Sequence, residues 1–325
     1  FDIRSNTQDD TKVGIDNEIN NRLKAPLTSI NKTSDLIGLR EFQNDSLFSD
    51  IDGEGYTVVV IDDGIDLNHP YFGPDLNRDG ISDRIIFNKD YYYDRPINSN
   101  DKSSHGTHVA GIIGSSNKTY PGIAPGVNII AFDVFNKNYP DEGTNFDIYK
   151  KPLKWVLNNY EKYNIVAVNM SLGGGNYSYK TYNSLFNSLE KAGIAVVVAT
   201  GNSYDKYSSP GIGNPANYSG TIAVSSVWAE TYSKSYTWKG MEPSPEYSSI
   251  GSIQPFSETI YSDYFPTKIG EFVPMAQRAN GIVDVLAPGF FIANASDQAS
   301  IGGTGDIRNS NSLVISKGGT SMAAP

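Results

Sequence analysis

Short, continuous apolar runs alternate with helical patterns along this chain, and this alternation limits the possible folds more than any other feature. The runs span 57–61, 165–168 and 194–199. Their length and composition are typical of strands buried on both faces. Between them, apolar residues recur with the period of a helix, and Gly193 is expected to end the second helix. The helical positions are Leu153, Val156, Leu157 and Tyr160, then Tyr182, Leu185, Phe186 and Leu189. We therefore expect a three-layer α/β/α fold with a mostly parallel central sheet.

In such a sheet, ligands and catalytic groups gather where the strands end. Asp62 directly follows the first apolar run and precedes Asp63 and Gly64, so a sharp turn would leave its carboxylate at the carboxyl end of the strand. Taken alone, Asp-Asp-Gly after a strand is more often an ordinary turn than a catalytic site. The assignment of a role to Asp62 depends on the other motifs.

Two of the three histidines fall in one short motif, His105-Gly106-Thr107-His108-Val109-Ala110-Gly111. Its small residues permit close packing, and the apolar positions after them predict a buried helix that begins near His105. A zinc site is disfavoured because no carboxylate accompanies the two histidines as in the helical zinc motifs.

A third motif, 318–325, places Ser321 among small residues at the predicted start of a helix. Small neighbours would let a substrate backbone approach the serine, and the helix N-terminus would favour negative charge there. An isolated serine is usually a solvated loop residue, but this octapeptide is far less common.

The segments 60–66, 105–111 and 319–325 resemble the three signature blocks of the subtilisin family, in the same order along the chain. Segment 169–174 is similar to the family's substrate-binding strand, and 199–202 to its oxyanion segment. The resemblance runs from about Leu39 to Pro325. Asp63 stands where many members have Thr or Ser, and the interval from Asn202 to Ser321 is longer than in compact relatives.

The resemblance implies a serine endopeptidase with Asp62, His105 and Ser321 as its triad and Asn202 as an oxyanion donor. It also implies that backbone groups pair with extended protein or peptide substrates, at Ser171, Leu172, Gly173, Gly174, Thr200 and Gly201. Two alternatives remain open. One is a catalytically inactive relative, such as a calcium-binding pseudoprotease or binding module. The other is a processing peptidase or peptide ligase that uses the same acyl-enzyme.

An acidic loop at 75–83 has the spacing of a calcium-binding loop. Oxygen ligands would come from the side chains of Asp75, Asn77, Asp79 and Asp83 and from the backbone carbonyl of Ile81. No glutamate closes the loop as in an EF-hand, and a solvated polar turn is the alternative. We predict a structural calcium ion and no organic cofactor.

Composition excludes several partners and chemistries. With 26 basic and 36 acidic residues, the formal charge is -10, which disfavours nucleic acid and anionic membranes as partners. The absence of cysteine excludes disulfides, thiolate metal sites and a cysteine nucleophile. The resemblance favours a secreted or extracytoplasmic monomer with a possible prosegment.

Domain boundaries follow changes in composition. Residues 1–38 are expected to be an N-terminal arm, linker or prosegment remnant, and residues 39–325 the catalytic domain. Residues 228–282, rich in Tyr, Pro and Ser, are predicted to be a surface insertion. Because the family continues past its serine motif into a long apolar helix, we expect that helix to be missing after Pro325, and the chain alone to be unstable or inactive.

Overall fold

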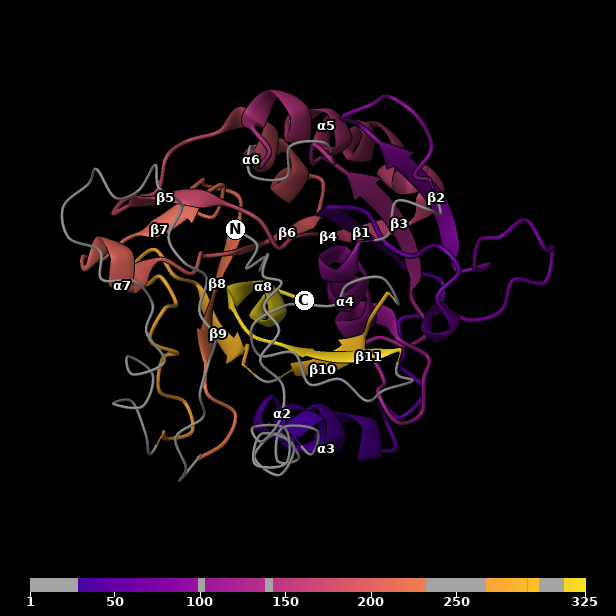
Figure 1. Ribbon diagram of the computed structural model, residues 1–325, viewed down its shortest axis with the longest axis horizontal. Coiled ribbons are helices and arrows are strands. Elements are labelled where there is room, and N and C mark those ends of the chain that lie inside the picture. Colours follow the sequence, from indigo (N-terminus) through magenta and orange to yellow (C-terminus); the bar gives the residue numbers. More distant parts are fainter. Residues whose placement is uncertain (1–28, 99–102, 138–142, 232–266, 291, 298–312) are drawn as a thin grey trace, which may run out of the picture.

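Seven parallel strands form the central sheet (Figure 1), in a computed structural model that describes residues 29–98, 103–137, 143–231, 267–290, 292–297 and 313–325. Their order across the sheet is β2-β3-β1-β4-β6-β8-β9, and each neighbouring pair is parallel. The strands are β1 (Thr57–Asp62), β2 (Ile85–Asp90), β3 (Asn128–Asp133), β4 (Ile165–Met170), β6 (Ala195–Ala199), β8 (Ile222–Val227) and β9 (Val285–Pro288). The predicted α/β fold with a mostly parallel sheet is confirmed.

Helices cover both faces of the sheet. On one face, α5 (Phe146–Tyr163) and α6 (Ser184–Lys191) bury Leu153, Val156, Phe186 and Leu189 against the strands. On the other face lie α4 (Ser104–Gly114) and the short α8 (Thr320–Ala323), and α4 packs its apolar side against β1 and β3. Figure 1 shows the three layers, with α5 and α6 above the sheet and α4 and α8 below it.

Smaller elements surround this frame. Two antiparallel pairs lie outside the main sheet, β5 (Gly174–Tyr177) with β7 (Ile212–Asn214) and β10 (Ile292–Ala295) with β11 (Val314–Lys317). The β10–β11 pair packs below α4 and leads directly into α8. The remaining elements are the helices α2 (Ser29–Leu36), α3 (Leu39–Asn44) and α7 (Tyr204–Tyr207) and the 3-10 turn η2 (Pro70–Phe72).

The apolar runs and helical patterns of the sequence became β1, β4, β6, α5 and α6. Tyr182 is an exception, because it precedes α6 and is exposed. The described ends of the predicted surface insertion at 228–282 contain both exposed and buried residues. Residues 268–271 are exposed, whereas Trp228, Val273 and Gln277 are buried, and the Trp228 N–H donates to the Glu271 carbonyl directly after β8. The tyrosine- and proline-rich centre of this insertion, 232–266, lies outside the described residues.

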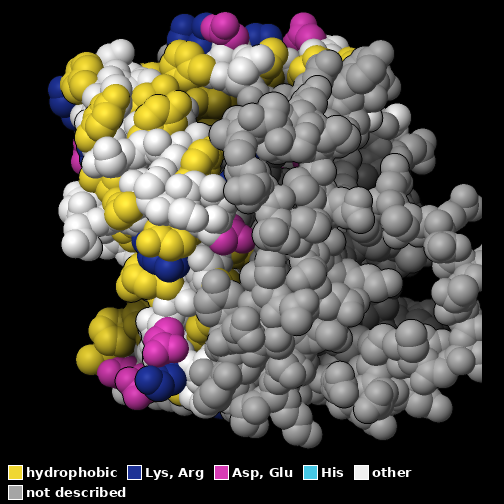
Figure 2. Space-filling model, turned by 60° about the vertical axis from the view of Figure 1, so that its left-hand side comes forward, with side chains coloured by type: hydrophobic (Ala, Val, Ile, Leu, Met, Phe, Trp, Pro, Cys, Tyr) yellow, Lys and Arg dark blue, Asp and Glu magenta, His cyan; other side chains and the backbone are white. Residues whose placement is uncertain are grey.

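Histidine side chains are scarce at the surface. His69 and His108 are fully buried, and no histidine is visible among the described residues on the face in Figure 2. That face instead carries hydrophobic side chains interspersed with polar ones. Among the described residues, none of the helices combines the length and hydropathy needed to span a bilayer.

Candidate active site

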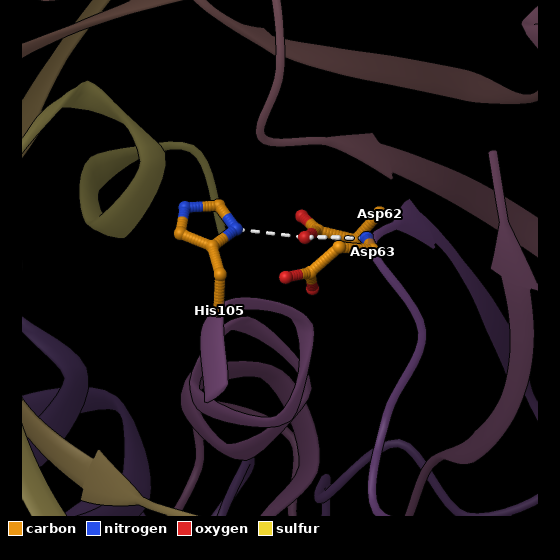
Figure 3. Close-up of side chains that lie close together, drawn as sticks. All are labelled: Asp62, Asp63 and His105. Carbon is orange, nitrogen blue, oxygen red and sulfur yellow. Dashed lines mark hydrogen bonds and ion pairs between the residues drawn. The ribbon is translucent and has the colours of Figure 1, made fainter. Parts of the chain in front are cut away.

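The Asp62 carboxylate and the His105 imidazole form a direct hydrogen bond at the carboxyl end of β1. His105 Nδ1 lies 2.7 Å from Asp62 Oδ1 (Figure 3). Asp62 is the last residue of β1 and is 1% exposed, and His105 stands in the first turn of α4. Because an ionised carboxylate only accepts hydrogen bonds, it favours the tautomer with the proton on Nδ1. The Nε2 atom is then a base that faces away from Asp62.

The start of α4 is fixed against the turn after β1. Ser103 caps the helix by accepting the Gly106 N–H, and Asp63 Oδ1 accepts the same N–H at 2.8 Å and the Ser103 hydroxyl proton. A Cβ atom at Gly106 would lie 2.0 Å from the carbonyl oxygen of Gly64, so only glycine allows this approach. The close contact sets the position of His105 relative to Asp62.

Asp62 and Asp63 are adjacent buried carboxylates whose surroundings differ. Burial raises the pKa of Asp62, while the hydrogen-bonded His105 opposes the rise and Asp63 adds to it. Asp62 Oδ1 accepts the Asp63 N–H as well as His105, but Oδ2 is buried without a hydrogen-bond partner among the described residues. Burial acts in the same direction on Asp63, but Lys137, His105 and Ser103 outweigh it and lower the pKa of that carboxyl.

Ser321 lies on the other side of the site, at the second residue of α8. Its hydroxyl donates to the Ser171 carbonyl oxygen at 3.1 Å, and the Ser171 hydroxyl donates to the Ser321 carbonyl at 2.7 Å. The Asn169 amide donates to that Ser171 hydroxyl at 2.9 Å. The end of β4 therefore holds the backbone and the side chain of Ser321 through neutral hydrogen bonds.

Asn202 is fixed next to the same serine. Its Oδ1 accepts the Thr320 N–H at 2.8 Å and the Thr320 hydroxyl at 3.1 Å, which commits the oxygen of the amide to the start of α8. A Cβ atom at Gly319 would lie 3.0 Å from Asn202 Nδ2, and Gly319 has φ 145, so the site needs glycine there. The amide N–H₂ of Asn202 is therefore the part available to a ligand in front of Ser321.

The two halves of the site meet because α4 and α8 contact each other. In Figure 3 the turn of α8 lies beside the imidazole, on the side away from Asp62. The Ser321 hydroxyl carries one proton, which it donates to Ser171 in this structure. Transfer of that proton to His105 requires the hydroxyl to change its acceptor.

The predicted substrate segment divides into a buried and an extended part. Ser171 and Leu172 are buried, and Gly174 begins β5, which pairs antiparallel with β7. A Cβ atom at Gly173 would lie 2.8 Å from the Asn214 carbonyl oxygen. The backbone at this segment therefore passes close to a second chain segment without side chains in between.

Thr200 and Gly201 are held by Gln277, a buried residue that sequence reasoning did not single out. The Thr200 hydroxyl donates to the Gln277 carbonyl, and the Gln277 N–H donates to Gly201 O at 2.8 Å. The Gln277 amide continues to Gly175 O at 3.0 Å. Through its backbone and its side chain together, this one residue thus links the segment before Asn202 to β5.

The predicted calcium loop forms a tight turn whose oxygens accept backbone N–H groups. Asp75 accepts from the N–H groups of Asp79 and Gly80, and Asp79 accepts from Ile81. Asn77 Oδ1 accepts the Asp79 N–H, and Asp83 Oδ2 accepts from Leu76. Among the described residues, three His, Asp or Glu ligand atoms within 4.8 Å of one another occur at Asp62, Asp63 and His105, and not in this loop. The loop has the backbone turn of a cation site, but its carboxylates are not gathered.

Several residues of the site escaped sequence analysis. Ser103 could have been predicted from the sequence, since a serine before a predicted helix is an N-cap candidate. Asp133 follows an apolar run just as Asp62 does, so the rule about strand ends could have found it. Gln277 acts through contacts across many residues of chain, which no local pattern encodes.

Comparison with known proteins gives consistent matches. A sequence model described as the subtilase family matches residues 53–325. Subtilisin E of Bacillus subtilis (strain 168) is 33% identical over 198 residues, which cover 58% of this chain and 46% of that protein. An alkaline proteinase of Hapsidospora chrysogena is 30% identical over 284 residues, 86% of this chain and 52% of that protein. The chain thus spans about half the length of the curated relatives it matches.

A solved structure shares the fold. The crystal structure of a cold adapted subtilisin-like serine proteinase superposes with a TM-score of 0.53 at 24% identity, covering 85% of this chain and 73% of that chain. At this identity the match shows the fold and no more.

Proposed function

Because the chain belongs to the subtilase family, we propose that it is a serine endopeptidase that hydrolyses peptide bonds in proteins through an acyl-enzyme intermediate. The single observation that carries this proposal is the 2.7 Å hydrogen bond between Asp62 and His105. His105 lies in α4, which contacts α8, the helix of Ser321. The same arrangement is common to the serine hydrolases.

In the proposed reaction, the Ser321 hydroxyl turns from Ser171 to His105 Nε2, gives up its proton and attacks the scissile carbonyl. Asp62 keeps the imidazole in the required tautomer and stabilises the imidazolium that forms. His105 then returns the proton to the leaving amine, and a water repeats the sequence to release the acyl group. The buried Asp62 Oδ1 is well suited to this because it also accepts the Asp63 N–H, which fixes its orientation.

Negative charge develops on the substrate oxygen as the tetrahedral intermediate forms. The Asn202 N–H₂ group and the Ser321 backbone N–H are the proposed donors to that oxygen. Support comes from the bonds of Asn202 Oδ1 to Thr320, which hold the amide in a fixed orientation before any substrate arrives. Such donors need no reorganisation during the reaction.

Extended peptide substrates are proposed to pair with the backbone of Ser171, Leu172, Gly173 and Gly174. Thr200 and Gly201 would line the same region next to Asn202. The main-chain character of this contact supports broad cleavage of proteins over recognition of one sequence. By family resemblance, we place the enzyme outside the cytoplasm, as a monomer with a possible prosegment.

A fluorophosphonate probe tests the proposal, because it reacts only with a serine activated by its neighbours. We expect the full-length protein to take up one label and Ser321→Ala to take up none, with casein hydrolysis lost in parallel. A folded protein that neither labels nor hydrolyses casein would favour the inactive relative. Peptide products joined to an added amine, detected by mass spectrometry, would favour a ligase.

We also propose that the 75–83 loop binds calcium as a structural ion, with ligands from Asp75, Asn77, Asp79, Ile81 and Asp83. Oxygen-rich donors in a tight turn are what Ca²⁺ prefers, and the loop would rearrange to gather its carboxylates. Bound ion would stabilise the fold by mass action. Chelation should lower the Tm of the wild type and leave that of Asp79→Ala unchanged. Equal Tm with and without chelator in the wild type would contradict the proposal.

A further inference from the structure

Three buried carboxylates stand together beside the candidate catalytic histidine. Asp62 ends β1 and Asp63 directly follows it, and Asp133 ends β3 directly opposite Asp62 in the strand register. Asp133 also forms an isolated bridge with Asp63, and all three residues are at most 4% exposed. Because buried like charges repel strongly, nearby positive charge is needed to keep all three carboxylates ionised together.

Lys137 supplies positive charge to this cluster. Its ammonium lies 3.0 Å from Asp133 Oδ2 and donates to the carbonyl oxygen of Asp63. Gly64 leaves the space for this contact, since a Cβ atom there would lie 3.1 Å from Asp133 Oδ2 and 3.6 Å from Lys137 Nζ. The Lys137 side chain is 23% exposed, so it is partly shielded from solvent.

The anionic Asp63 in turn anchors the helix that carries His105. Its Oδ1 accepts the Gly106 N–H and the Ser103 hydroxyl proton, so it holds both the cap residue and the first turn of α4. Among the groups that lower the pKa of Asp63 against the effect of burial, Lys137 is the strongest. Burial raises the pKa of Asp133 to about 6 in spite of Lys137. Lys137 therefore contacts Asp63, and Asp63 in turn contacts the start of α4.

We propose that Lys137 is a positioning residue for the candidate catalytic pair, because it joins Asp133 to the Asp63 segment that anchors the start of α4 and places a positive charge near His105. Lys137 reaches the start of α4 through Asp63, whose carbonyl oxygen it contacts and whose carboxylate accepts the Gly106 N–H, and its positive charge acts on the site from there. Removal of a positive charge raises the pKa of every neighbouring titratable group. Loss of Lys137 should therefore raise the pH at which the imidazole loses its proton.

The charged groups around the cluster come from four segments. Asp62 and Asp63 face it from β1, Asp133 and Lys137 from β3 and the segment after it, and His105 from α4. Asp90, the last residue of β2, is opposite Asp133 in the register but is paired with Arg95 at 3.4 Å. Uptake of a proton by one of these carboxylates would remove a negative charge near His105 and so reduce the upward shift of its midpoint.

Lys180 offers a matched control. It lies 2.8 Å from Asp284 Oδ2 and donates to the Thr221 carbonyl, so it also joins a carboxylate to a backbone oxygen. Its side chain is 25% exposed, close to the value for Lys137. Lys180→Met removes the same charge from the far side of the sheet, where β8 and β9 lie.

The experiment is an NMR titration of the histidine ring protons in the full-length protein, with His105 assigned by His105→Gln. We expect Lys137→Met to raise the His105 midpoint by about 0.5 to 1 pH unit, the size of a partly screened charge at this range. Lys137→Arg should restore the wild-type midpoint, and Lys180→Met should leave it unchanged. An unchanged midpoint in folded Lys137→Met, with a lowered Tm in both methionine variants, would show a purely structural role and overturn the proposal.

A second variant keeps the test decisive if Lys137→Met fails to fold. Asp133→Asn removes a negative charge from the same cluster and should move the His105 midpoint downward, and an upward or absent shift would contradict the proposal. The activity readout rests on the proposed function: the acid limb of kcat/KM should follow each midpoint. Because the ring titration needs no turnover, a protein without activity would refute the proposed function while the role of Lys137 is still tested.

Discussion

The two sides of the candidate site are built from different interactions. Around His105 the contacts are charged and buried, with Asp62, Asp63 and Asp133 at the ends of β1 and β3 and Lys137 between two of them. Around Ser321 they are neutral, and consist of hydroxyl, amide and backbone groups at the ends of β4 and β6. Substitutions on the first side should therefore have effects that depend on pH and on charge, and substitutions on the second side should have effects that depend on shape.

Asp62→Asn removes the negative charge that contacts His105 and should cause the largest loss of kcat. The amide would present an N–H or a neutral oxygen to His105 Nδ1, so the favoured tautomer and the support for the imidazolium are lost. We expect kcat to fall by about 10⁴-fold, which is the order of magnitude measured when the triad aspartate of subtilisin is replaced. Steady-state kinetics on a peptide substrate gives the value.

Asp90→Asn is the control for that loss. Asp90 is as buried as Asp62 and also ends a strand, but it contacts Arg95 and the N–H groups of Tyr92 and Tyr93. The Asp90→Asn substitution should lower the stability of the fold and leave kcat per folded molecule within a few-fold of the wild type. Equal losses of kcat in the two variants would mean that burial of a carboxylate matters and contact with His105 does not.

Asn202→Ala tests the neutral side at its proposed oxyanion donor. We expect kcat to fall by about 10² to 10³-fold, the loss measured for the corresponding donor of subtilisin, and we expect KM to stay nearly unchanged. Because the lost group carries no charge, the loss should be the same across the pH range of activity. A loss that varies steeply with pH would break the distinction between the two sides.

Ser171→Ala should have a smaller effect on the same side. It removes the hydroxyl that donates to the Ser321 carbonyl and leaves the Asn169 amide without that acceptor. We expect the free energy of unfolding to fall by about 1 to 3 kcal/mol, the cost of an unsatisfied buried polar group. Denaturant unfolding measures this loss. A variant as stable as the wild type would show that water replaces the hydroxyl.

Local patterns predicted the central pair of the charged side, Asp62 and His105, but not Ser103, Asp133 or Lys137 around it. Asp62 and His105 each sit at the junction of a strand or helix with a turn, and such junctions are visible in the sequence. Ser321 was singled out by its octapeptide, whereas Asn202 was predicted from the family resemblance alone, and their mutual contact runs through Thr320, 118 positions from Asn202. The burial of Trp228 and Gln277 was missed because aromatic and polar composition alone favours surface, whereas packing under β8 decides their place.

Asp133→Asn should change how stability depends on pH, with an effect of about 2 to 3 kcal/mol. Burial raises the pKa of Asp133 to about 6, above its ordinary value of 3.8, so the folded state binds this proton more tightly than the unfolded state. The contribution of Asp133 to stability is therefore present below about pH 4 and is lost as pH rises to 6. Burial lowers the pKa of His69, which gives the opposite slope below pH 6.5, but that contribution is the same in both proteins and cancels.

Unfolding free energies at pH 4 and pH 7 should thus differ between wild type and Asp133→Asn by the stated amount, with the variant relatively more stable at pH 7. The unfolding free energy of Ser171→Ala should differ from that of the wild type by the same amount at both pH values, because no charge changes on the neutral side. If the unfolding free energy of Asp133→Asn also differs from the wild type by the same amount at both pH values, the buried carboxylates do not titrate as a linked group. The two sides of the site would then differ in geometry alone.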